Sequence, residues 1–235
     1  MLIEFCKVTN KIYFFGGCMK PAHSTYSLFK KTSSLFPFIC AFLIIWVFNT
    51  FVIPGQLYEC AVYLPFHGGA SRWFVVFSDW FFHMGWGLGN NVLVAVHIFS
   101  NCYFIHLIST VLDSQWGKWP TIVVFVLPQV ILRAVLILLD SPFGITAVFG
   151  TSSFGISGMM GAVLAYCLFN REFWDKWKVN WFFRWIPAWL IIGIIMSYIT
   201  NGDWSVTLLY IVTIILGFAF CFIIHKRIAS AVNSS

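Results

Sequence analysis

Six apolar stretches, each about 20 residues long, constrain this chain of 235 residues more than any other feature. An α-helix needs about 20 mainly apolar residues to cross the hydrocarbon of a bilayer. The stretches cover residues 35–54, 89–112, 119–139, 153–170, 181–200 and 204–225. The whole chain is 60% hydrophobic and only 9% charged, a balance that excludes an ordinary soluble domain and also intrinsic disorder. The predicted fold class is therefore an all-α membrane protein with six transmembrane helices.

The basic residues indicate how these helices are oriented. When the spans alternate in direction, 12 of the 14 Lys and Arg residues fall on one side of the membrane. Positive charge in short loops marks the cytoplasmic side, so both termini are predicted to be cytoplasmic. Residues 1–34 are then a basic cytoplasmic segment and not a cleavable signal peptide, residues 35–225 are the membrane domain, and residues 226–235 are a cytoplasmic tail. For a bacterial chain, the predicted location is the cell membrane, as a multi-pass protein.

The remaining composition excludes several classes of protein. The formal charge of +6 does not indicate nucleic-acid binding, because the basic residues lie between apolar runs instead of clustering on one polar helix. Seven cysteines show no CxxC pair and no metal-ligand spacing, so they are predicted to be small buried hydrophobic residues. No metal and no organic cofactor is predicted. The loop 55–88 is rich in Trp and Phe, and it is predicted to lie in the interface on the outer side of the membrane.

Polar side chains inside the apolar stretches are candidate functional residues, because they are costly in hydrocarbon. His97 and Asn101 are four residues apart in the second stretch, hence on one face of a helix. The third stretch contains Pro128, Gln129 and Arg133. Hydrogen bonds between helices and local packing are the structural explanation of both groups, whereas a polar path through a transporter is a functional one.

The fourth stretch contains a GxSG sequence at residues 155–158, with Gly155 and Gly158 around Ser157. A serine between glycines lets another backbone or a substrate approach its hydroxyl closely. Ser157 is predicted to start a helix that enters the membrane from the outer side, where helix-end amides could stabilise an oxyanion. The structural alternative is close helix packing through small residues such as Gly158 and Gly161.

Together these residues resemble the rhomboid family of intramembrane serine proteases. That family has a six-helix core with a cytoplasmic N-terminus, an HxxxN pattern on helix 2 and GxSG at the start of helix 4. Here His97 and Asn101 supply HxxxN, and Ser157 is the serine of GxSG. Asp113 and Gly117 follow at the family's usual offsets as the acidic residue and the glycine that end helix 2. The resemblance covers all six apolar stretches and implies a rhomboid-like bundle.

The resemblance also implies a role for each residue of the site. Ser157 would be the nucleophile that attacks a peptide carbonyl, while His97, Asn101 and the Ser157 amide would hold the oxyanion. The family's general base is a histidine in the outer half of helix 6, and Tyr210 occupies that position here. The phenol of tyrosine has a pKa of about 10 in water, so it is a poor base near neutral pH. His97 is therefore the hypothesised base, with His83 as a second candidate.

The sixth stretch leaves two functions open. The family pattern HxxGxxxG of helix 6 aligns with residues 210–217, which places Thr213 at the first glycine and Gly217 at the second. The first function is a rhomboid-like serine protease that cleaves transmembrane substrates near the outer face of the membrane. Because a serine without its base loses most of its catalysis, the alternative is a catalytically inactive rhomboid-like protein that binds transmembrane helices. Either function implies the lipid bilayer and transmembrane-helix proteins as partners.

Overall fold

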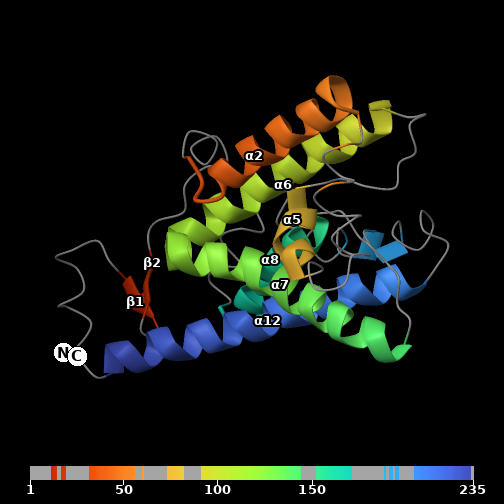
Figure 1. Ribbon diagram of the computed structural model, residues 1–235. Coiled ribbons are helices and arrows are strands. Elements are labelled where there is room, and N and C mark those ends of the chain that lie inside the picture. The colour runs from red at the N-terminus through yellow and green to blue at the C-terminus, as the bar shows by residue number, and fades with distance from the viewer. Residues whose placement is uncertain are drawn as a thin grey trace, which may run out of the picture.

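The computed structural model shows a bundle of long helices (Figure 1). It describes residues 12–14, 17–19, 32–54, 56, 60, 73–81, 91–143, 152–170, 188, 191–192, 194–195 and 204–233. Its helical elements are α2 (Phe36–Val47), the π-helix η2 (Phe48–Val52), α5 (Val75–Ser78), the 3-10 helix η5 (Asp79–Phe81), α6 (Asn91–Trp116), α7 (Lys118–Phe143), α8 (Ser153–Phe169) and α12 (Trp204–Asn233).

Three segments of these helices are long and apolar enough to cross a membrane. They are Ala95–Trp116, Lys118–Leu139 and Thr207–Ile224. Two further helices, Phe36–Val52 and Ser153–Phe169, are apolar but shorter. The prediction of an α-helical membrane protein is confirmed at this level.

The observed helices follow the predicted stretches closely but extend beyond three of them. α6 continues past residue 112 to Trp116, α7 past residue 139 to Phe143, and α12 past residue 225 to Asn233. The reason is that polar residues end an apolar stretch without ending a helix, because the backbone hydrogen bonds do not depend on side-chain polarity. Residues 226–233, predicted as part of a tail, are therefore the last turns of α12. The predicted span 181–200 lies outside the described residues, except for five helical positions between 188 and 195.

A short hairpin was not predicted from the sequence. β1 (Ile12–Phe14) pairs with β2 (Gly17–Met19) in antiparallel register, with Phe14 opposite Gly17. β-branched and aromatic residues followed by glycines favour a hairpin, and this signal was masked by the basic character of the segment. The hairpin lies beside the C-terminal half of α12 (Figure 1).

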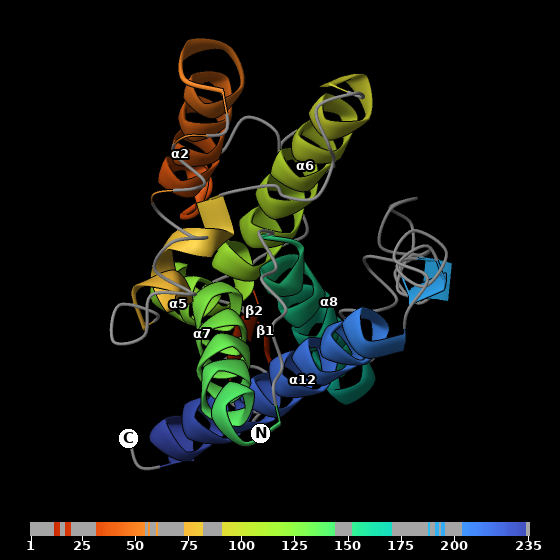
Figure 2. The same cartoon turned by 45° about the vertical axis from the view of Figure 1, so that its right-hand side comes forward.

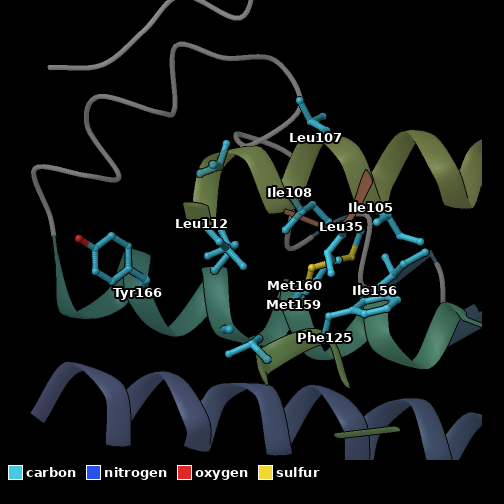
Figure 3. Packing of buried hydrophobic residues seen from close by; sticks show 14 of the residues in the cluster. Leu35, Ile105, Leu107, Ile108, Leu112, Phe125, Ile156, Met159, Met160 and Tyr166 are labelled. Carbon is cyan, nitrogen blue, oxygen red and sulfur yellow. The ribbon is translucent and has the colours of Figure 1, made fainter. Parts of the chain in front are cut away.

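α8 and α12 lie side by side (Figure 3), and two ring contacts show that they run in the same direction. Near the start of both helices, the rings of Phe154 and Tyr210 pack with their centroids 4.6 Å apart. Further along, Phe169 packs against Phe218 with a centroid separation of 6.0 Å.

α7 runs antiparallel to α8. The guanidinium of Arg133, late in α7, lies over the ring of Phe154, early in α8. Pro128, earlier in α7, lies against Gly158, later in α8. The reversal between α6 and α7 takes a single residue, Gly117, whose φ of +89° is in the left-handed region that favours glycine.

α6 runs parallel to α8, and α2 runs against both. Trp116 at the end of α6 packs on Tyr166 near the end of α8, with ring centroids 5.3 Å apart. The same end of α6 meets the start of α2, where the amide and hydroxyl of Ser34 each donate to the Asp113 carboxylate at 2.7 Å. Figure 2 shows α2 and α6 leaning away together from the other helices beyond this contact. Among the described helices, α6, α8 and α12 therefore share one direction, and α2 and α7 take the other.

The hydrophobic core lies where α6, α7 and α8 meet (Figure 3). Side chains of α6 at intervals of three and four residues point toward α8, as one helical face should. These side chains are Ile105, Ile108 and Leu112, and they meet Ile156, Met159 and Met160 of α8 together with Phe125 of α7.

Candidate functional site

Ser157 lies one turn inside α8 and is 9% exposed. The helix begins at Ser153, so the prediction that Ser157 starts it is wrong by about one turn. The first backbone bonds of α8 run from the Gly155 and Ile156 amides to the Ser152 carbonyl. Continuing that α-helical pattern, the Ser157 amide is directed at the Ser153 carbonyl and not outward. In this arrangement, the Ser157 amide therefore does not point toward a position where it could donate to an oxyanion.

The two glycines around Ser157 are sites of close helix packing. A Cβ atom at Gly155 would overlap the Gln129 amide nitrogen and the Phe125 ring of α7. A Cβ at Gly158 would lie 2.9 Å from Pro128, also on α7. Ser157 is thus held in a segment whose backbone is pressed against a neighbouring helix.

α12 approaches the same segment from another side. A Cβ atom at Gly217 would overlap the backbone carbonyl of Gly158, and one at Gly161 would overlap the carbonyl of Ile214. Small residues permit this kind of backbone contact between membrane helices. The predicted packing role of Gly158 and Gly161 is therefore confirmed.

His97 and Asn101 form a hydrogen-bonded pair on α6. Asn101 Nδ2 and His97 Nε2 are 3.2 Å apart, and since the amide nitrogen can only donate, the imidazole nitrogen accepts. Asn101 is buried, and it lies one turn before Ile105 on the face of α6 that packs against α8. Because α6 and α8 are parallel, this pair and Ser157 occupy the same half of the bundle.

Tyr210 meets α8 one turn before Ser157. Its hydroxyl lies 2.6 Å from the hydroxyl of Ser153, and its ring packs on Phe154. The backbone carbonyl of Tyr210 accepts a hydrogen bond of 2.8 Å from the Thr213 hydroxyl. The structure therefore brings Tyr210 to Ser153, a residue that sequence reasoning did not single out.

Buried polar side chains of α7 and α12 surround the first turn of α8. Arg133 is 4% exposed, and its Cζ atom lies 5.0 Å from the centroid of the Phe154 ring. Gln129, one turn earlier on α7, is fully buried and donates from Nε2 to the Phe125 carbonyl at 3.0 Å. Thr207, three residues before Tyr210 on α12, is also fully buried. The spacing of three between Thr207 and Tyr210 was a signal in the sequence that both residues share a helical face.

The structure also bears on the predictions for the cysteines, for metal binding and for the loop 55–88. Three of the cysteines, Cys102, Cys167 and Cys221, are buried as predicted, whereas Cys60 is exposed. In the part of the chain that the structure describes, no three His, Cys, Asp or Glu residues are placed to hold a metal ion. His83 and most of loop 55–88 lie outside the described residues.

The described part of the aromatic loop has two unlike faces. Trp73, Phe74 and Phe77 are exposed, while Val75 and Trp80 are buried. Exposed aromatic side chains on a short helical segment are typical of contact with the membrane interface. This arrangement agrees with the predicted interfacial position of the loop.

Comparison with protein-family models, with curated proteins and with solved structures finds no match for this chain. The chemistry of the site thus follows from its own residues. The Ser157 hydroxyl lies on α8, whereas the buried Asn101 amide and the His97 imidazole lie on α6 in the same half of the bundle. Groups of these types serve acyl transfer when they converge. The buried cation Arg133 lies near Ser157, over the ring of Phe154.

Proposed function

We propose that this protein is a rhomboid-like intramembrane serine protease with six transmembrane helices and both termini in the cytoplasm. It would be a multi-pass protein of the cell membrane that cleaves transmembrane substrates, with Ser157 as the nucleophile. The alternating directions of α2, α6, α7 and α8 support the topology, because each described helix runs as the positive-inside pattern requires.

The observation that carries the proposal is the position of Ser157. It is buried where α7 and α12 both touch the backbone of α8, and Asn101 is buried on α6 in the same half of the bundle. A nucleophile in a dry, rigid site needs donors for the developing oxyanion, and the amide of Asn101 would supply one. His97 is also the proposed base, acting once its Nε2 atom exchanges Asn101 for the Ser157 hydroxyl.

Labelling of the detergent-solubilised protein with a fluorophosphonate probe tests this function, because the probe reacts only with an activated serine. Ser157→Ala should reduce labelling to background, and His97→Ala should slow it by about 100-fold or more. Ser109→Ala is the matched control, since Ser109 is a buried serine that bonds only within α6. Labelling that survives in Ser157→Ala would refute the assignment of the nucleophile.

A second function is favoured by the contact of Tyr210 with Ser153. The residue at the family's base position is engaged one turn away from Ser157, and the Ser157 amide lies inside the helix. Both observations suit a catalytically inactive rhomboid-like protein that binds transmembrane helices. Well-folded wild-type protein that shows no probe labelling, yet binds a transmembrane peptide, would favour this second function.

A further inference from the structure

The charged side chain buried beside the candidate site has no role in the proposed chemistry. Arg133 lies within the apolar segment Lys118–Leu139, and its guanidinium covers the ring of Phe154, three residues before Ser157. An arginine in the hydrocarbon region is expensive and marks a binding site by default. A guanidinium carries five N–H donors, so it can bind a ligand in addition to its contacts within the protein.

A buried acceptor accompanies this cation. Gln129 lies one turn from Arg133 on the same face of α7, and its Nε2 atom is used by the Phe125 carbonyl. Among the residues that the structure describes, the buried Oε1 atom of Gln129 accepts no hydrogen bond. Buried polar atoms are nearly always paired, so this oxygen calls for a donor outside the described residues.

The facing helix shows the same feature. Thr207 Oγ1 is buried on α12 without a hydrogen bond to any described residue. Thr207 is one turn from Tyr210, which packs on Phe154. Helices α7 and α12 thus each carry a buried oxygen without a hydrogen-bond partner among the described residues, close in sequence to residues that pack on Phe154.

We propose that Arg133 binds an acidic side chain of the membrane segment that reaches Ser157, and that Gln129 accepts a backbone N–H of the same segment. A carboxylate matches the planar fork of a guanidinium, and charge-assisted hydrogen bonds are about twice as strong as neutral ones. The N–H comes from an unwound stretch of peptide, because a helix keeps its own amides paired. This inference names the substrate class of the proposed function and rests on it.

The ligand enters past the hydrogen bond between Ser153 and Tyr210. These two residues are the half-buried members of the cluster, whereas Phe154, Gln129 and Arg133 are buried behind them. Exchange of one neutral hydrogen bond for a charge-assisted pair makes this opening favourable for an acidic segment.

Binding of model peptides to the full-length Ser157→Ala protein in detergent micelles tests the inference without cleavage. Three fluorescent single-span peptides would differ at one residue, Asp, Asn or Lys, within a Gly-Ala stretch that unwinds easily. Fluorescence anisotropy should show the Asp peptide binding at least tenfold more tightly than the Asn peptide. Equal affinity for these two peptides would overturn the inference, and this comparison needs no change at Arg133.

Variants that change the charge at Arg133 then test whether this residue binds the acidic side chain of the peptide. Arg133→Gln should remove the preference for Asp, and Arg133→Glu should transfer it to the Lys peptide. Lys118→Gln is the matched control, because Lys118 is an exposed cation on the same helix. A preference for Asp that persists in Arg133→Gln would overturn the proposal, as would its loss when phosphatidylglycerol is added, which would assign the site to an anionic lipid.

The outcomes separate this inference from the proposed function. Cleavage by the wild-type protein without preference for Asp would leave the protease proposal intact and refute the role of Arg133. Binding of Asp peptides through Arg133 without cleavage or probe labelling would support the inference for a helix-binding protein and refute the protease.

Discussion

The two ends of the helix bundle are held together by different chemistry. At one end, called here the Asp113 end, a carboxylate accepts two short hydrogen bonds from Ser34 and a left-handed glycine starts α7. At the opposite Tyr210 end, a neutral bond between two hydroxyls lies beside the buried guanidinium of Arg133. The Asp113 carboxylate is bonded within the bundle, whereas buried oxygens of Gln129 and Thr207 near the Tyr210 end have no hydrogen-bond partner among the described residues.

Between these two ends, α8 and α12 make a close backbone contact. Gly158 and Gly217 bring the backbones of α8 and α12 together, and side chains would not fit there. This close packing holds the backbone around Ser157 against α12. We therefore expect the loss of stability to be largest for a change at the glycine contact, smaller at the Asp113 end and smallest at the Tyr210 end.

Gly217→Val should have the largest effect on stability. Its Cβ atom would overlap the Gly158 carbonyl, so α8 and α12 must separate, and the expected loss is about 3 kcal/mol or more in the free energy of unfolding. Thermal unfolding in detergent, followed by tryptophan fluorescence, measures it. Ile215→Val is the control, since Ile215 is 60% exposed on the same helix. An unchanged unfolding midpoint for Gly217→Val would contradict the close contact.

Asp113→Ala should have the next largest effect, and it tests the first end of the comparison. The change leaves the amide and hydroxyl of Ser34 without their acceptor, and hydrogen bonds to charged groups contribute about 1.5–3 kcal/mol. We expect a loss of about 2 kcal/mol in the free energy of unfolding, about half of which should appear in Ser34→Ala.

Ser114→Ala is the matched control for this end. The Ser114 hydroxyl donates only to the Val111 carbonyl in its own helix, so its removal should change the unfolding midpoint little. Equal effects of Asp113→Ala and Ser114→Ala would show that the contact between α2 and α6 adds no stability.

The sequence was sufficient to predict the helices but not the contacts at the Tyr210 end. Apolar length alone indicated α6, α7 and α12, because about 20 apolar residues leave a chain few choices other than a membrane helix. The packing of Gly158 was also predictable, since small residues mark close approach. The stretch 153–170 also matched the bounds of α8, but Ser157 was wrongly expected at the start of that helix, because the glycines beside it, which mark contacts with α7 and α12, were taken to mark the helix start.

Two features of the site depend on how helices are rotated and shifted relative to one another. The partner of Tyr210 is Ser153 and not Ser157, a difference of one helical turn that spacing within a single helix cannot show. The carbonyl of Val124, which Pro128 leaves without its helical donor, lies against Gly158, and Arg133 packs on Phe154.

Tyr210→Phe should have the smallest effect on stability and tests the second end of the comparison. It removes one neutral hydrogen bond between α8 and α12, and such bonds in membrane proteins contribute about 0.6 kcal/mol on average. Ser153→Ala should match it, and the double variant should lose no more than either single change. If His97 is the base of Ser157, fluorophosphonate labelling should persist in Tyr210→Phe. Loss of labelling with little loss of stability would instead make Tyr210 part of the catalytic site, and the Tyr210 end would then be held by a catalytic group.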